Sequence, residues 1–322
     1  MKVAVRSSLK DTGPQPRTNH RLKASTVRLM KQNIPLMIMF LPGLLFYIIF
    51  KYAPMGGIII AFKDFNLRDG IFGSPWVGMD NFVQLFNQAQ SLQIIRNSFL
   101  ISILGLVVGF PMPIILAIML NEVRKMWFKR VVQTLVYLPH FLSWVIVGGI
   151  VLSLFALESG TINRWLEGIL AEPYPFMYEK VSWLFIYLGS GVWKEMGFAA
   201  IIYLAALSAI DPHLYEAGSI DGANKWQQIR HITIPGISTT IILLLILSVG
   251  KVMDVGFDQI YNLQNAVVSD IANVISLYIY QIGILRGQYS LTAAMGIFEN
   301  LVGLVLILLA NYIARKFNQG LW

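Results

Sequence analysis

Long apolar stretches alternate with short charged segments along this chain. Six stretches are long enough to form membrane-crossing helices, at residues 32–50, 97–121, 131–157, 181–210, 231–250 and 287–314. A helix needs about 20 predominantly apolar residues to cross a hydrocarbon core of about 30 Å. The pattern therefore predicts an all-α integral membrane protein with spans at about 34–52, 97–121, 131–156, 183–210, 237–255 and 290–314.

A seventh apolar stretch, residues 271–285, is uncharged but short. Its 15 residues reach only about 22 Å as a helix, and it also carries Asn273 and Gln281. We interpret it as an interfacial or re-entrant helix.

The composition supports a lipid environment. The 322 residues are 56% hydrophobic and 13% charged, whereas a soluble domain carries about 25% charged residues. The chain has no cysteine, which excludes disulfides and metal sites built on thiolates.

Basic residues indicate the orientation of the chain. Lys and Arg gather before the first span, after the second span and at Arg315 and Lys316, whereas Glu is more frequent after the third span. Because cytoplasmic loops carry an excess of Lys and Arg, both termini are predicted to be cytoplasmic. The first apolar stretch begins too late for a cleavable signal, so residues 1–33 are interpreted as a basic cytoplasmic tail and 34–322 as one membrane domain.

The segment 211–236, between the fourth and fifth spans, has a distinctive pattern and is predicted to be cytoplasmic. Ala217, Ile220 and Ala223 recur every three residues and give a short apolar ridge. Gly222 is able to interrupt a helix there. The pattern predicts two short helices with an apolar knob that fits a partner's groove, although an ordinary amphipathic connector would share this spacing.

The same segment resembles the "EAA" coupling loop of binding-protein-dependent ATP-binding-cassette (ABC) importer permeases, in which E-A-x-x-x-D-G-A precedes I-x-I-P. The residues that match are Glu216, Ala217, Asp221, Gly222, Ala223, Ile234 and Pro235. Gly218 departs from the family, which usually has a second alanine there. The resemblance implies coupling helices that dock in a cleft of a cytoplasmic ATPase.

Other segments resemble the carbohydrate branch of that family, at residues 74–82, 96–99, 120–124, 137–144 and 193–197. The resemblance is to permeases for oligosaccharides or polysaccharides, alginate oligosaccharides among them, with the type I importer architecture. It implies a heterodimer with a second permease, two copies of an ATPase that binds ATP and Mg²⁺, a solute-binding protein and a place in the bacterial inner membrane. The resemblance implies no cofactor, no metal and no catalytic residue in this chain.

Charged residues inside the predicted spans are candidates for the transport pathway. Lys194, Glu195 and Glu299 interrupt otherwise apolar stretches, and a charge at the bilayer centre costs at least about 2.5–3.5 kcal/mol. With Trp193 they are predicted to border the pathway. Alternatively they only pair with one another, and we expect Glu299 to be the better partner of Lys194 because neighbouring residues point to different helix faces.

Two other classes of function remain as alternatives. The chain lacks the phosphate-binding motif G-x-x-x-x-G-K-[ST], so an ATP-driven importer needs a partner ATPase. A secondary transporter driven by an ion gradient would use intramembrane charges and often shows inverted repeats, and the chain has no visible repeat. An intramembrane enzyme would need clustered catalytic residues, whereas the four histidines are scattered.

Overall fold

The computed structural model describes residues 33–166, 168–169, 172–316 and 320, so the predicted tail lies outside the described residues apart from Asn33. In these ranges every regular element is helical, and β-type pairing is limited to a bridge between Lys63 and Trp76. The chain forms two compact units, one up to Ile58 and one from Ile59 onward.

The first unit is one long apolar helix in its described part. It comprises α2 (Ile34–Tyr47), the π-helical turn η1 (Ile48–Tyr52) and α3 (Ala53–Met55), and the chain continues through η2 (Gly56–Phe62). Pro35 stands in the first turn, where its missing N–H forfeits no hydrogen bond. The apolar side chains of α2 are exposed on every side of the helix, as in a helix that faces lipid.

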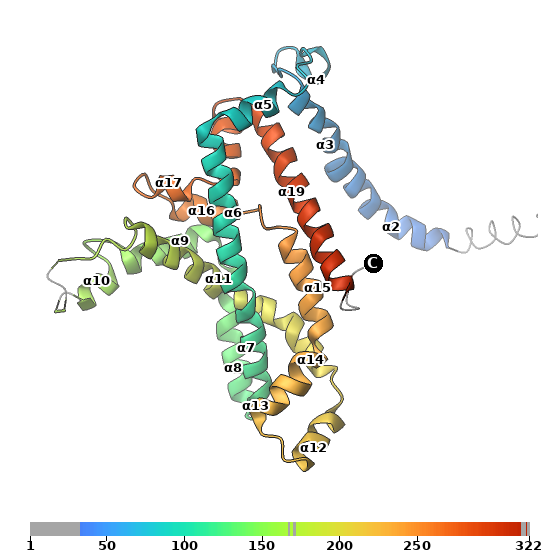
Figure 1. Cartoon of the computed structure of the whole chain (residues 1–322), viewed down its shortest axis with the longest axis vertical. Helices are drawn as coiled ribbons and strands as arrows, with labels where there is room; N and C mark the ends of the chain where they lie inside the picture. Colours follow the sequence, from blue (N-terminus) through green and yellow to red (C-terminus); the bar gives the residue numbers. More distant parts are fainter. Residues whose placement is uncertain (1–32, 167, 170–171, 317–319, 321–322) are drawn as a thin grey trace, which may run out of the picture. The chain divides into compact units, whose positions relative to one another are not determined.

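Three long helices organise the second unit. They are α6 (Ala89–Gly109) continued by α7 (Pro111–Glu122), then α11 (Lys180–Ser208), and α19 (Tyr289–Arg315). In Figure 1, α6 and α7 form one column, with α12 (Pro212–Ile220) and α13 (Lys225–Gln228) at one end and α5 (Asp80–Asn87) at the other. Helix α11 packs along α7, and α19 packs against α5 and α15 (Ser238–Val249).

The third predicted span is bent rather than straight. Helix α8 (Met126–Tyr137) leads through the 3₁₀ turn η3 (Leu138–Phe141) into α9 (Trp144–Phe155), and the two helical segments meet at 105°. Pro139 has no N–H for the helix ladder. The Ser143 side chain then accepts a hydrogen bond from the backbone N–H of Ile146 and caps the new helix. The span predicted at about 131–156 therefore consists of two helical segments that meet at a bend.

The fifth predicted span also ends early. Helix α15 stops at Val249, and a turn leads to α16 (Phe257–Leu263). Residues 250–255, which were predicted to belong to the span, are therefore not helical. Gly250 lies against Gly303 of α19 so closely that a Cβ on Gly303 would lie 2.5 Å from the Gly250 carbonyl oxygen. In the described residues three helices are long and apolar enough to cross a membrane, and up to six spans result when each bent helix pair counts as one.

The seventh apolar stretch lies inside the second unit. It divides into α17 (Ser269–Ala272), α18 (Ile275–Tyr278) and η5 (Ile279–Leu285). The Asn97 amide donates to the carbonyl oxygens of Asp270 and Asn273, and Lys180 pairs with the Asp270 carboxylate. The hydrogen bond from Lys180 lowers the pKa of Asp270. These bonds attach the segment to α6 and to the start of α11.

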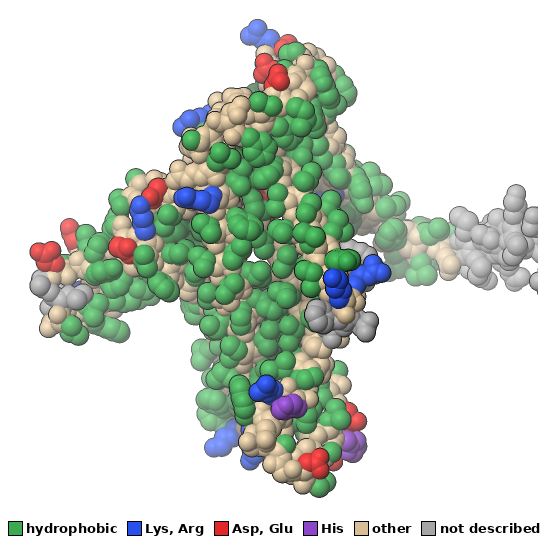
Figure 2. All heavy atoms as spheres, viewed as in Figure 1, with side chains coloured by type: hydrophobic (Ala, Val, Ile, Leu, Met, Phe, Trp, Pro, Cys, Tyr) green, Lys and Arg blue, Asp and Glu red, His purple; other side chains and the backbone are tan. Residues whose placement is uncertain are grey.

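Short helices complete the chain. They are α4 (Gly70–Gly73), α10 (Thr161–Leu166), η4 (Ile229–Thr233) and α14 (Ile234–Gly236). Figure 2 shows hydrophobic side chains over the middle of the visible face of the second unit, with charged side chains at its top and bottom, along the arm that carries α10 and at the edge near the C-terminus. This distribution suits a protein whose middle faces lipid.

Candidate functional site

The segment 211–236 folds as two short helices separated by a tight turn. The Asp211 side chain accepts a hydrogen bond from the backbone N–H of His213 and caps α12. Gly222 then adopts a positive φ of 79°, a conformation that costs other residues roughly 1–2 kcal/mol. Asn224 and Gln227 form a reciprocal capping box that starts α13.

Side-chain hydrogen bonds hold the two short helices together. The hydroxyls of Tyr215 and Thr233 lie 3.1 Å apart, and the Gln228 amide donates to the Ser219 hydroxyl at 2.9 Å. These bonds connect α12 with α13 and η4, so the segment is positioned as one body.

An ion pair attaches this segment to the rest of the second unit. Lys225 Nζ lies 2.9 Å from a carboxylate oxygen of Glu122, at the end of α7. It places the segment 211–236 and the basic loop after α7 at the same end of the second unit.

Apolar side chains of this segment project outward. Ile220 is 86% exposed and Trp226 is 69% exposed, which leaves apolar surface available to a partner. Most of the residues that carry the coupling-loop resemblance are also exposed: Glu216, Ala217, Asp221, Gly222, Ile234 and Pro235. Ala223 and Gly218 are half-buried, and a Cβ on Gly218 would lie 3.2 Å from Ile232 Cδ1, a tight contact with the end of a flexible side chain.

A cavity of about 480 Å³ lies among the long helices. Its walls are residues 101–113 of α6 and α7, residues 187–203 of α11 and residues 244–259. These residues occupy the middle of the 34-residue helix Ala89–Glu122 and of α11. The cavity therefore borders the middle of two candidate membrane spans.

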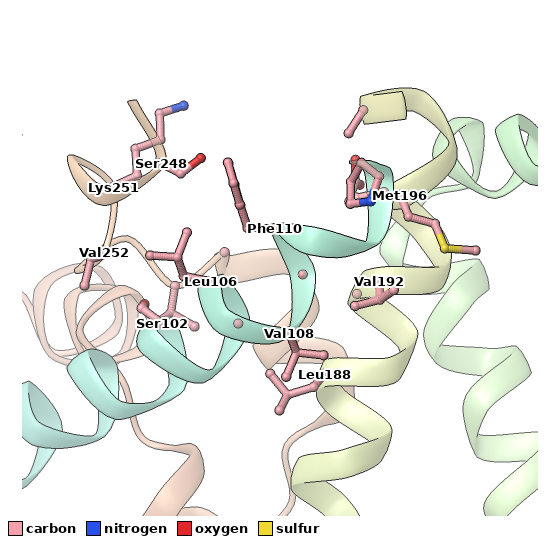
Figure 3. Close-up of a pocket in the computed structure, with 18 of the residues that line it drawn as sticks. Ser102, Leu106, Val108, Phe110, Leu188, Val192, Met196, Ser248, Lys251 and Val252 are labelled. Atoms are coloured by element: carbon pink, nitrogen blue, oxygen red, sulfur yellow. The ribbon is translucent and has the colours of Figure 1, made fainter. Parts of the chain in front are cut away.

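Glycines leave space in the cavity, and charged side chains contribute polar groups to its wall. Gly105 and Gly109 of α6 and Gly191 of α11 line it without side chains. In the view of Figure 3 the Phe110 ring stands between Met196 on one side and Ser248 with Lys251 on the other. The charged groups in its wall are Glu195, Lys251 and Asp254.

Lys194 and Glu195 form a network with the bend between α8 and α9. Lys194 is 6% exposed, and its Nζ donates to the His140 carbonyl at 2.9 Å and to Glu195 Oε1 at 3.1 Å. His140 Nδ1 lies 2.8 Å from Glu195 Oε2, and its ring stacks on Phe198. The ammonium also lies 5.5 Å from the centroid of the Trp144 ring.

The expected pairing of Lys194 with Glu299 was wrong. The long lysine side chain reaches its sequence neighbour, so the difference in helix face between Lys194 and Glu195 does not separate them. No hydrogen bond or ion pair joins Glu299 to another residue within the described ranges. Of the four predicted pathway residues only Glu195 lines the cavity; Trp193, Lys194 and Glu299 lie outside its wall.

Phe110 and Lys251 line the cavity but were not predicted from the sequence. Phe110 is hidden within a uniformly apolar stretch, and only the packing of α6 and α7 against α11 places it at the cavity. Lys251 carries a visible signal, since it is a charge directly after an apolar stretch. No group of three or more His, Asp or Glu side chains arranged for a metal ion occurs in the part of the chain that the structure describes.

Replacing Lys194 by methionine is expected to destabilise the protein by about 1–3 kcal/mol, because the carbonyl of His140 loses its buried donor. Thermal unfolding of the purified complex measures this loss. In a double-mutant cycle with Glu195→Gln we expect a coupling of about 0.5–3 kcal/mol. Strictly additive effects would show that the Lys194–Glu195 bond contributes nothing.

Known proteins resemble this chain over most of its length. Residues 109–321 match the family model described as "Binding-protein-dependent transport system inner membrane component". The polygalacturonan/rhamnogalacturonan transport system permease protein YteP of Bacillus subtilis (strain 168) is 41% identical over 297 residues, which cover 92% of each chain. A chain of a bacterial ABC transporter involved in the import of the acidic polysaccharide alginate has a TM-score of 0.83 at 40% identity, covering 91% of this chain and 99% of its own. A second structure, the alginate transporter with an alginate pentasaccharide-bound periplasmic protein, gives the same TM-score and identity and covers 91% of this chain and 98% of its own.

Proposed function

Since the chain belongs to the family of binding-protein-dependent transport system inner membrane components, we propose that it forms one half of the membrane pathway of an importer for acidic oligosaccharides. It is a carbohydrate permease subunit of an ABC importer, a multi-pass protein of the inner membrane and not itself an enzyme. A second permease, an ATPase and a periplasmic binding protein are its partners.

The cavity carries the proposal. It borders the middle of two candidate membrane spans, and its wall combines apolar surface with hydroxyl, amide and charged groups, the mixture that a sugar with polar edges and apolar faces requires. The partner permease would complete the pathway from the other side. The two acidic-polysaccharide transport systems among the relatives support an oligosaccharide of uronic acids, such as galacturonate or mannuronate, as the substrate.

The segment 211–236 is proposed to transmit the movement of the ATPase. Its exposed apolar side chains Ile220 and Trp226 would dock on the ATPase. The coupling residues are then Glu216, Ala217, Gly218, Asp221, Gly222, Ala223, Ile234 and Pro235. ATP and Mg²⁺ would bind on the ATPase alone, and both termini of this chain would lie in the cytoplasm, as the basic residues predict.

Uptake of a labelled galacturonate trisaccharide into proteoliposomes that contain the whole importer tests this function. We expect uptake that requires both ATP and the binding protein. Uptake that follows an ion gradient without ATP would instead support the secondary-transporter alternative.

Co-purification with Gly222→Asp tests the coupling role. We expect the variant to retain the second permease and to lose the ATPase, because an aspartate would place a buried charge in the docked turn. Gly222→Asn is the matched control, since asparagine has the same shape, also tolerates a positive φ and carries no charge. Equal loss of the ATPase from both variants would assign the effect to the backbone rather than to the charge.

A further inference from the structure

Lys251 occupies an unusual place for a basic residue. It lies two residues after the end of α15, in the wall of the cavity. Helix α15 has 12 residues and rises about 18 Å from Ser238, so a span that enters a hydrocarbon layer of about 30 Å at Ser238 would have its far end inside the layer. A charge at this depth is retained only where it faces water, a partner group or a ligand.

The turn after α15 places Lys251 in the wall of the cavity. The backbone N–H of Lys251 donates to the Ser248 carbonyl at 3.1 Å, and its own carbonyl accepts from Asp254 N–H at 2.9 Å. Val252 and Met253, between these two charged residues, are buried. The two buried side chains anchor the turn, while Lys251 and Asp254 are exposed.

The ammonium group of Lys251 has no protein partner in the described part of the chain, where neither a hydrogen bond nor an ion pair engages its side chain. Lys194 differs, because its ammonium is buried and is already bound by the His140 carbonyl and Glu195. Lys251 is thus the one cationic side chain in the wall of the cavity, as far as the structure describes it. It has three N–H donors to offer.

Glu195, in the α11 part of the cavity wall, presents complementary chemistry. Its two carboxylate oxygens accept one hydrogen bond each, from Lys194 and from His140. A carboxylate has about four acceptor sites, so about two remain for a ligand. Since Lys194 offsets its charge, Glu195 is suited to accept hydrogen bonds from sugar hydroxyls without strongly repelling an anion.

We propose that Lys251 binds a carboxylate of the passing oligosaccharide, while Glu195 accepts hydrogen bonds from its hydroxyls. This assignment deepens the proposed function and rests on it. It makes Lys251 a specificity-determining residue that distinguishes uronic acid oligomers from their neutral counterparts, because a charge-assisted bond to a carboxylate is about twice as strong as one between neutral groups.

The whole importer in proteoliposomes tests this role with two probes, galacturonate trisaccharide and mannuronate trisaccharide, each supplied below saturation. We expect Lys251→Gln to lower the initial uptake rate of the accepted probe by about tenfold or more. The matched control Lys251→Arg keeps the charge and is expected to retain uptake within about threefold of the wild type. ATPase activation by the loaded binding protein should stay within about twofold in both variants, because neither docking surface is altered.

Two results with the variants would overturn the assignment of Lys251. One is uptake by Lys251→Gln at the wild-type rate. The other is an equal loss of uptake and ATPase activation, which would indicate a role in structure or coupling. The wild-type importer could also take up neutral trisaccharides with ATP but neither of the two uronate trisaccharides. That result would reject the carboxylate-binding role of Lys251 and leave the importer function intact. Absence of any ATP-dependent sugar uptake would reject the proposed function itself, and this assignment with it.

Discussion

Gly197→Ala is expected to destabilise the second unit strongly, by about 3 kcal/mol. Gly197 lies in α11 where that helix crosses α8, and an added Cβ would lie 1.9 Å from the Val136 carbonyl oxygen and 2.5 Å from its carbonyl carbon. Both atoms belong to backbone, so the clash is relieved only if the helices separate. Overpacking of this kind typically costs about 1–3 kcal/mol and sometimes more.

Because of the position of Gly197, we expect a destabilisation in the upper part of the range of about 1–3 kcal/mol. Val136 lies directly before the bend, and Lys194, one turn earlier on α11, binds the carbonyl of His140. Separating α11 from α8 would therefore stretch this buried hydrogen bond too. Small residues at helix crossings in membranes allow backbones to approach closely, and at this crossing hydrogen is the only substituent that fits.

The thermal midpoint and the size-exclusion profile of the detergent-solubilised complex measure this effect. Gly189→Ala is the matched control on the same helix, because no atom lies within 4 Å of the position of its added Cβ. We expect that variant to equal or exceed the wild type, since alanine favours a helix over glycine by about 1 kcal/mol. Wild-type stability of Gly197→Ala would show that α8 and α11 are not packed as described.

Ile220→Asp is expected to abolish coupling to the ATPase while leaving the permease folded. Ile220 is 86% exposed at the end of α12, so an aspartate there disturbs no internal packing. In the docked state the loss of a buried isoleucine costs about 1.5–3 kcal/mol, and an unpaired carboxylate adds a desolvation cost. Together these effects predict roughly 100-fold weaker docking or more.

Retention of the ATPase during purification and ATP hydrolysis stimulated by the loaded binding protein are the two measurements for Ile220→Asp. Ile220→Val is the control that keeps an apolar side chain, and we expect it to resemble the wild type. The thermal midpoint of the permease pair should not change in either variant. Normal ATPase retention by Ile220→Asp would exclude Ile220 from the docking surface.

Local sequence patterns were sufficient to predict the general class of this protein. Apolar stretches of about 20 residues predict a membrane protein because the bilayer sets both the length and the polarity of a span. The turn at Gly222 and the caps at Asp211 and Asn224 are likewise local, since each depends on residues within one helical turn. The family resemblance rests on the same segment, and the comparisons confirm the family.

The local sequence of a single apolar stretch was not sufficient to predict where each helix bends or ends. Pro139 is visible in the sequence, but a proline does not determine a bend of 105°; that angle is maintained by the close approach of Gly197 to Val136 and by the Lys194 network. The end of α15 likewise lies against Gly303, 53 residues further along the chain than Gly250.

The sequence by itself determined that this chain is an all-helical carbohydrate permease, because this class depends on hydropathy and short motifs. Only the tertiary structure decided that Glu195 and Lys251 share one cavity and that Lys194 does not line it. The cavity combines residues from 101 to 259 in the chain, and their meeting depends on which helix faces pack together. Hydropathy does not specify those faces, since lipid-facing and buried sides of a membrane helix are similarly apolar.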